Sequence, residues 1–433
     1  MHPRNNTPRV RMAGTIAFLV IYAAFFIVLV KIGPLLQRDS STYLQKAHIV
    51  SPLYPLFLQI HKSIFADGFL TAVIITQLLL GFGACLWFAH AMRRLFSLPH
   101  FMRGLLAIIL LMPYVIATRF GNSILTEGLA YPLFLVVMKY FLEGMVRRSS
   151  SSLIWMLLLS VVLVLTRRQF SVLYPLFAVA LFYMFLFAPS AYRKFTLLFV
   201  LLFAAALAQF AERAVQYKRD GRFTNIPFTG FHLVTAPLFI AASGDADHFT
   251  DERLRALFSE THQRLAAKGL LESSPAPDGS HVRLQLIDRY HGSYNAICWG
   301  TLLPVLHENG ITDWYEIDKV TRGMLRPLIQ HNWRSFLQLY RQNIARGAGG
   351  ILHAIFLGVF MALACAYHII KRDGLSLAAA LVSMLSIGSL LVIALAEPVR
   401  SRYIAYTAGL QICFYIIVAV QCFRSQPGTD SPD

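Results

Sequence analysis

The chain has 433 residues, of which 56% are hydrophobic and 14% are charged, and its net charge is +17. A soluble domain carries roughly 25% charged residues, so this composition excludes an ordinary soluble protein. The net positive charge does not indicate a nucleic-acid partner, because the largest polar region, residues 215–350, holds fifteen Lys and Arg against thirteen Asp and Glu. Most of the excess lies in short loops between apolar stretches, where basic residues orient membrane helices.

Ten apolar segments approach the length of roughly 20 residues that a helix needs to cross a bilayer. They are 13–33, 69–91, 102–118, 128–146, 153–167, 170–188, 195–213, 351–370, 376–396 and 403–423. The first segment is too long for the apolar core of a signal peptide, and no small-residue cleavage site follows it. The sequence therefore predicts an all-α polytopic membrane protein with about ten transmembrane helices.

The short loops between these segments carry basic residues on alternate sides. One side collects Arg4, Arg9, Arg11, Arg93, Arg94, Arg103, Arg147, Arg148, Arg193, Lys194, Lys371, Arg372 and Arg424. The positive-inside rule then predicts that both termini lie in the cytoplasm. The location that we expect for such a protein is the bacterial inner membrane.

This orientation divides the chain into three parts. A transmembrane module of about seven helices spans 1–213 and includes an outer loop at 34–68. An extracytoplasmic loop domain spans 214–350, and a module of about three helices spans 351–433.

The two outer regions also predict helices. A short helix over Leu56 to Phe65 follows Ser51-Pro52-Leu53-Tyr54-Pro55, because Pro is favourable in a first helical turn. In the loop domain, Asp251 to Leu271 carries a rough apolar stripe, and Thr321 to Ile344 leads into the eighth segment. A surface turn is expected at 273–279, where Ser, Pro, Asp and Gly gather. The loop domain should therefore be mostly helical.

Charged residues gather at the predicted outer ends of the membrane helices. Asp39, Glu127 and Glu397 are acids at such ends, and basic residues accompany them at Arg38, Arg119, Arg167, Arg168, Arg400 and Arg402. Charges at this depth are costly unless they pair with one another or face a hydrated cavity. Two interpretations follow: salt bridges that anchor helix ends, or a polar site in which carboxylates accept protons and guanidinium groups hold a phosphate.

The order of these motifs resembles the GT-C class of membrane glycosyltransferases, which includes protein O-mannosyltransferases and lipid A aminoarabinose transferases. The resemblance rests on Gln37-Arg38-Asp39-Ser40-Ser41-Thr42-Tyr43, Ser51-Pro52-Leu53-Tyr54-Pro55, Thr126-Glu127, Thr166-Arg167 and Glu397-Pro398-Val399-Arg400-Ser401-Arg402-Tyr403. It covers the first six predicted helices and the last one.

The resemblance implies an enzyme that transfers a sugar from a polyprenyl-phosphate-linked donor in the membrane lipid to an acceptor on the outer face. Asp39 matches the catalytic base of the class, and Glu127 resembles its second acidic position. Arg402 and Tyr403 resemble a late pair near the donor phosphate, to which Arg167, Arg168 and Arg400 would add charge, with support from Arg119, Tyr54 and Glu397. Many members have two adjacent acids where this chain has Asp39-Ser40, a difference that weakens any divalent-metal site, and no cofactor is indicated.

Two other functions stay open on the sequence alone. An O-antigen ligase or polymerase would place its catalytic charges mainly in the large outer loop. A transporter or flippase of lipid-linked sugars would have charges or broken helices near mid-membrane and two related halves. The fourteen histidines lack the i, i+4 spacing with a carboxylate that a metal-binding helix needs, and Asp245-Ala246-Asp247 lacks the glycine and terminal Glu of a calcium loop.

Overall fold

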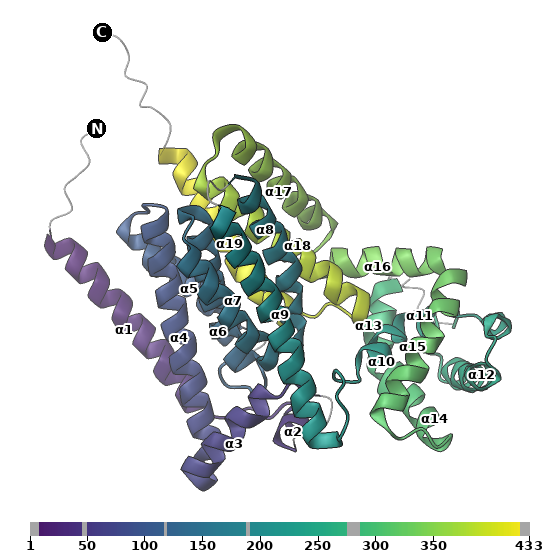
Figure 1. Ribbon diagram of the computed structural model, residues 1–433. Coiled ribbons are helices and arrows are strands. Elements are labelled where there is room, and N and C mark those ends of the chain that lie inside the picture. Colours follow the sequence, from purple (N-terminus) through teal and green to yellow (C-terminus); the bar gives the residue numbers. More distant parts are fainter. Residues whose placement is uncertain (1–7, 46–49, 117–118, 188–190, 275–285, 425–433) are drawn as a thin grey trace. The chain divides into compact units, whose positions relative to one another are not determined.

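A computed structural model describes residues 8–45, 50–116, 119–187, 191–274 and 286–424 (Figure 1). The structure is 84% helical, and no strand occurs in the part of the chain that it describes. The prediction of an all-α protein is therefore confirmed. The chain forms two compact units: unit 1 comprises 1–215, 360–386 and 405–433, and unit 2 comprises 216–359 and 387–404.

Unit 1 is a bundle of apolar helices. Its helices are α1 (Pro8–Ile32), α2 (Ser40–Leu44), α3 (Leu53–Phe65), α4 (Phe69–Leu95), α5 (His100–Val115), α6 (Glu127–Arg147), α7 (Ser150–Thr166) and α8 (Leu173–Phe187), with 3₁₀ turns η1 (Ala66–Gly68) and η2 (Arg168–Val172). Parts of α9 (Ala191–Asp220), α17 (Ile351–Lys371), α18 (Gly374–Ala396) and α19 (Ser401–Arg424) complete it. The short helix predicted over Leu56 to Phe65 is confirmed as α3.

Seven helical stretches in the described residues are long and apolar enough to cross a membrane. They are Leu53–Leu95, Glu127–Arg147, Arg168–Leu186, Phe195–Asp220, Ile351–Lys371, Gly374–Ala396 and Ser401–Arg424. Apolar helices α1, α5 and α7 coincide with the other three predicted segments but are shorter where the structure describes them. The chain is thus a multi-pass membrane protein, and the number of ten crossings stays a prediction.

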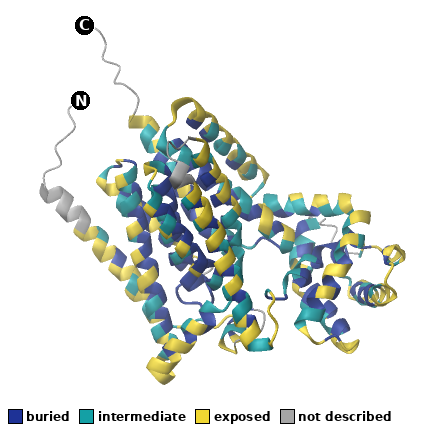
Figure 2. Ribbon diagram, in the orientation of Figure 1, coloured by how far each residue is buried: buried dark blue, intermediate teal, exposed yellow. Residues whose placement is uncertain are grey.

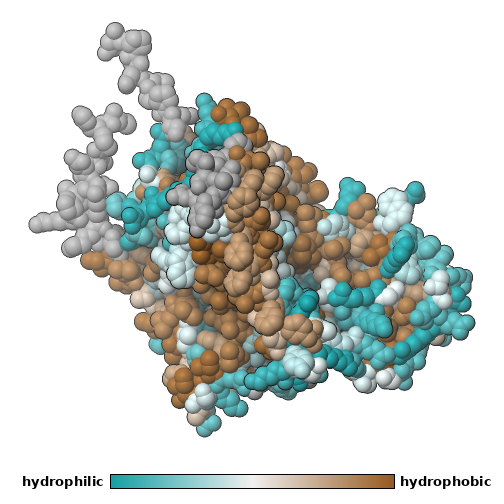
Figure 3. All heavy atoms as spheres, viewed as in Figure 1, coloured by the Kyte–Doolittle hydropathy of each residue, from teal (hydrophilic) through white to brown (hydrophobic). Residues whose placement is uncertain are grey.

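Many large apolar side chains of these helices are exposed, which is unfavourable in water. Leu352 is 80% exposed and Ile370 is 74% exposed, both on α17. Apolar surface covers the sides of the unit 1 helices in Figure 3, while buried residues fill the interior of the bundle in Figure 2. Lipid tails can cover such a surface without the free-energy cost that water imposes.

Unit 2 is a smaller helical body with its own apolar core. It contains α10 (Thr229–Leu233), α11 (Thr235–Ile240), η3 (Ser243–His248), α12 (Glu252–Ala267), α13 (Leu286–Ile297), π-helical η4 (Cys298–Leu302), α14 (Leu303–Glu308), α15 (Trp314–His331) and α16 (Trp333–Gly347). Phe231, Phe258 and Ile297 are among the fully buried residues of its core. This core explains how a polar stretch of the sequence folds compactly.

The predictions for this region are met in part. The helix expected from Asp251 is confirmed as α12, and the Asp251 carboxylate caps it by accepting hydrogen bonds from the backbone N–H groups of Arg253 and Leu254. The turn expected at 273–279 falls largely on residues outside the described part.

The single helix predicted over Thr321 to Ile344 is wrong. The chain instead forms α15 and α16, which meet at Asn332. The Asn332 side-chain amide donates to the Leu328 carbonyl (3.1 Å) and to the Asp245 carboxylate (2.6 Å). Asn side chains compete in this way with backbone hydrogen bonds, so the helix is interrupted at that residue.

Candidate functional site

The first loop of unit 1 is tied to the segment that precedes α6. The backbone N–H of Leu35 donates to the Asn122 carbonyl (2.7 Å), and the N–H of Ile124 donates back to the Leu35 carbonyl (3.1 Å). The side-chain amide of Asn122 donates to the carbonyls of Leu29 (2.7 Å) and Gly33 (2.9 Å), which end α1. These bonds hold the chain that leads to Asp39 beside the chain that leads to Glu127.

Glu127 and Arg167 form a buried ion pair where α6 begins and α7 ends. Their atoms Oε2 and Nη1 are 2.7 Å apart, and Glu127 is only 1% exposed. The same guanidinium group donates to the Thr126 hydroxyl (2.8 Å), which in turn donates to Glu127 (3.2 Å). Arg167 also lies over the Tyr406 ring of α19, with 5.9 Å between the guanidinium carbon and the ring centroid. Burial and several partners fix the position of both charges.

Two tyrosines of the first loop pack beside this pair. The ring of Tyr43 lies edge-on to that of Tyr54, with 5.3 Å between centroids. The buried Tyr54 hydroxyl donates to Gln77 of α4 (2.9 Å), whose amide donates to the carbonyls of Gly121 and Ser123. The α6 backbone approaches Gln77 closely, since a Cβ on Gly128 would lie 2.4 Å from the Gln77 side chain. A side chain at Gly128 would therefore displace the Gln77 amide and its hydrogen bonds.

Electrostatics places Asp39 in the same group. Burial raises the pKa of the Tyr43 hydroxyl, and the negative charges of Glu127 and Asp39 raise it further. Arg167 and a hydrogen bond with Thr126 have the opposite effect on this pKa. Asp39 is half-buried and directly precedes α2, whereas Glu127 is fully buried. We call Asp39, Tyr43, Thr126, Glu127 and Arg167 the carboxylate site. A partly exposed carboxylate lies there beside a buried ion pair, which is an arrangement suited to proton transfer.

The other predicted residues of unit 1 lie outside the carboxylate site. Arg168 pairs with Glu212 of α9 (3.2 Å), a carboxylate that is 3% exposed. Arg119 is exposed, and its side chain has no hydrogen bond or ion pair with the described residues. Tyr54 contacts the carboxylate site through Tyr43, in keeping with a supporting role.

A second polar group lies in unit 2, around the turn between α18 and α19. Asn343 of α16 donates from its amide nitrogen to the carbonyls of Ala394 and Glu397, both at 3.0 Å, and its amide oxygen accepts from the Val399 N–H at 3.0 Å. These three bonds fix the amide orientation. The same oxygen lies 3.2 Å from Nε2 of His291, so this ring nitrogen carries the proton and donates. Asn343 thereby holds the turn 397–400 in place.

Three of the five predicted phosphate-binding residues, Arg400, Arg402 and Tyr403, occupy this turn and the start of α19. The buried Tyr403 hydroxyl donates to the Glu397 carboxylate (2.8 Å) and accepts from Nη2 of Arg402 (2.9 Å). The guanidinium carbon of Arg402 lies 4.9 Å from the Tyr403 ring centroid. We call Glu397, Arg400, Arg402 and Tyr403 the turn cluster.

The charge of Arg400 affects the pKa of two groups in unit 2, His291 of α13 and Cys298 of η4. Burial lowers the pKa of His291, and the charge of Arg400 lowers it further. The hydrogen bond that His291 donates to Asn343 opposes both effects. Burial also raises the pKa of the Cys298 thiol to about 12, despite the opposing effect of Arg400. A neutral imidazole and a protonated thiol therefore lie near this guanidinium group at neutral pH.

Sequence reasoning found the charged members of both groups but missed the polar residues that position them. Gln77 and Asn343 are neutral and belong to no motif, so nothing in a single sequence distinguishes them from other polar residues. Tyr43 ends the first-loop motif that begins at Gln37, but the motif assigns it no role. Glu212 could have been found, since it is an acid inside an apolar segment. Among the described residues, no group of three or more His, Cys, Asp and Glu could hold a metal ion.

No protein-family model, no curated protein and no solved structure matches the chain.

Proposed function

We propose that this chain is a GT-C-type glycosyltransferase of the bacterial inner membrane. It transfers a sugar from a polyprenyl-phosphate-linked donor to an envelope lipid, glycan or protein acceptor on the outer face. The observation that carries the proposal is the carboxylate site, where half-buried Asp39 and the buried Glu127–Arg167 pair both act on Tyr43. The motif order that resembles the GT-C class supports it.

The chemistry assigns a separate role to each group. An Asp39 oxygen accepts the proton of the acceptor hydroxyl as that oxygen bonds to the anomeric carbon of the sugar. The bond between the anomeric carbon and the phosphate oxygen breaks, and the polyprenyl phosphate leaves with an additional negative charge. By the motif resemblance, Arg402 would stabilise that charge, and Arg400 would add to this stabilisation. Glu127 remains paired with Arg167 and positions the segment that faces Asp39.

The donor-binding role of Arg402 is tested by substitution in the full-length protein. A planar guanidinium group binds phosphate oxygens through two parallel hydrogen bonds, which an ammonium group cannot reproduce. We expect Arg402→Ala to lower kcat/KM for a polyprenyl-phosphate-linked sugar roughly tenfold to hundredfold, and Arg402→Lys to lower it less. Release of polyprenyl phosphate in proteoliposomes measures the reaction.

Arg341→Ala is the matched control, because Arg341 is an exposed arginine of α16 outside the turn cluster. It should keep wild-type kinetics. If Arg402→Ala also keeps them, the cluster only anchors helix ends and the phosphate role is wrong.

The proposed orientation places both termini in the cytoplasm and the polar residues of unit 2 outside. Cys298 is buried, so an introduced cysteine is needed, and exposed Cys422 should first be replaced by serine. A membrane-impermeant thiol reagent should then label Ser243→Cys in intact cells, since Ser243 is exposed. His100→Cys, at the exposed start of α5, should react only after the membrane is permeabilised. The reverse pattern would invert the topology and move the carboxylate site to the cytoplasmic side.

A ligase or polymerase of envelope glycans is the second candidate function. The turn cluster favours it, because Arg400 there lies near His291 and Cys298 of the loop domain. Such an enzyme would lose activity on Arg400→Ala and keep it on Asp39→Asn. The proposed GT-C function predicts that Asp39→Asn causes the greater loss.

A further inference from the structure

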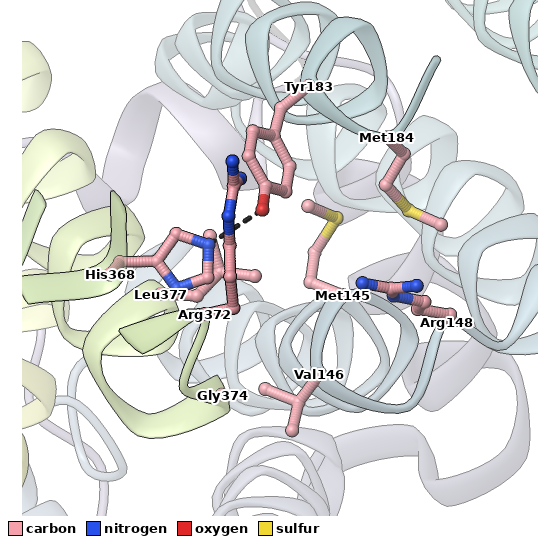
Figure 4. A pocket seen from close by; sticks show the side chains of 9 residues that line it. All are labelled: Met145, Val146, Arg148, Tyr183, Met184, His368, Arg372, Gly374 and Leu377. Atoms are coloured by element: carbon pink, nitrogen blue, oxygen red, sulfur yellow. Dashed lines mark hydrogen bonds between the residues drawn. The ribbon is translucent and has the colours of Figure 1, made fainter. Parts of the chain in front are cut away.

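A small polar cavity lies at the end of the unit 1 bundle where α6, α8 and α17 end and α18 begins. Its volume is about 80 Å³, and its polar lining residues are Arg148, Tyr183, His368 and Arg372 (Figure 4). One water-sized group needs roughly 10–15 Å³ of such space, so the cavity can hold about five to eight. A phosphate group occupies less space than five separate water molecules, because its atoms are bonded to one another, and therefore fits the cavity.

A hydrogen-bond chain fixes the base of the cavity. Nδ1 of His368 donates to the Asp373 carbonyl (2.7 Å), and Nε2 lies 2.7 Å from the Tyr183 hydroxyl. A carbonyl can only accept, so Nδ1 carries a proton, and the second hydrogen bond joins Nε2 to the Tyr183 hydroxyl. His368 is buried, so the chain provides a preformed polar floor.

The residues that line the cavity carry a net positive charge. Arg148 and Arg372 both line it with exposed side chains that a ligand can reach, and no lining residue is acidic. Asp373 lines the adjoining groove, where its carboxylate accepts from the Ser376 N–H (2.7 Å) at the start of α18. Two guanidinium groups beside hydrogen-bonding side chains favour an anion in the cavity.

An apolar groove continues from this cavity. It measures about 940 Å³ and shares Val146 and Gly374 with the cavity lining. Most of the rest of its wall is apolar and comes from the ends of α4, α17, α18 and α19, including Phe360, Leu363 and Val418. Polar cavity and apolar groove together match a ligand with an anionic head and a hydrocarbon chain.

We propose that this cavity binds the phosphate headgroup of an anionic membrane lipid, whose hydrocarbon chain occupies the groove. The site differs from the carboxylate site, because Glu127 and Arg147 are opposite ends of α6, whose 21 residues span about 30 Å. It lies at the end whose basic residues predict the cytoplasmic face, where anionic headgroups gather. The inference goes beyond the proposed transfer reaction and does not depend on it.

Lipid binding to the full-length protein in neutral detergent tests the proposal. Native mass spectrometry or a fluorescent-lipid titration should show that phosphatidylglycerol binds at least roughly tenfold more tightly than phosphatidylcholine, which carries no net charge. Inorganic phosphate should compete only weakly, because it lacks the chain that fills the groove. This comparison uses the wild-type protein and needs no variant.

Testing the roles of Arg148 and Arg372 requires substitutions that preserve the backbone conformation at these positions. Arg148 and Arg372 both have left-handed backbone angles, with φ of 54° and 53°, so asparagine is the suitable neutral replacement. We expect the pair Arg148→Asn and Arg372→Asn to weaken phosphatidylglycerol binding roughly tenfold or more. The control pair Arg147→Gln and Lys371→Gln removes two charges from neighbouring positions outside the cavity and should retain most of the affinity.

Three results would overturn the proposal. Equal losses in the two double variants would show a diffuse surface charge rather than a site. Equal affinity for phosphatidylcholine would remove the anion requirement. Competition by inorganic phosphate as effective as that by the lipid would identify a free-phosphate site instead.

Discussion

Asp39→Asn should lower sugar transfer by roughly a hundredfold or more without lowering the amount of protein in the membrane. Asparagine has nearly the shape of aspartate but cannot accept the proton of the acceptor hydroxyl. Asp39 makes no side-chain cap to α2, so the substitution should leave that short helix intact. The assay compares initial rates of polyprenyl phosphate release in proteoliposomes that contain equal amounts of each protein.

Asp67→Asn provides the control for this experiment. Asp67 is an exposed acid of η1, also between α1 and α4, but it lies outside the carboxylate site. It should keep wild-type transfer. Near-wild-type transfer by the Asp39 variant would remove Asp39 from the mechanism and favour a catalytic site in the turn cluster.

Breaking the Glu127–Arg167 pair should have the largest effect on stability. Removal of either partner leaves a buried charge without its counterion, which costs about 3–5 kcal/mol. Glu127→Gln and Arg167→Met should therefore each lower the free energy of unfolding of the protein in detergent or bicelles. The double variant should lose less than the sum of the single losses, because both residues belong to one interaction.

Glu143→Gln is the matched control on the same helix. Glu143 pairs with Lys139 and Arg147 near the other end of α6, and its side chain is 22% exposed. Such an ion pair contributes only about 0–1 kcal/mol. Additive losses in the Glu127–Arg167 cycle would contradict a direct coupling between the two charges.

The two sets of substitutions separate catalysis from architecture. Asp39 is half-buried and accessible, so its loss should appear in the rate and leave unfolding unchanged. Glu127 is fully buried and held by Arg167, so its loss should appear first in unfolding. A carboxylate that changed both properties equally would be acting through the fold rather than on the acceptor.

The sequence by itself determined the membrane class and the helical composition. Hydropathy is a local property, so runs such as 128–146 and 376–396 predict helices that the structure finds at α6 and α18. The unusual cost of charge beside lipid also marked Asp39, Glu127 and Arg167 as candidates, since such residues need partners or water.

Only the tertiary structure decided which partners these residues have. Arg167 and Arg168 are neighbours in the chain, yet one pairs with Glu127 and the other with Glu212 of α9. Asn343 holds a turn more than fifty residues away through three hydrogen bonds. Asn332 separates two helices where the sequence predicts one continuous helix. Periodicity and hydropathy report the environment of each segment, whereas the partner of a polar side chain depends on which segments pack together. That choice arises from long-range packing, which no local pattern encodes.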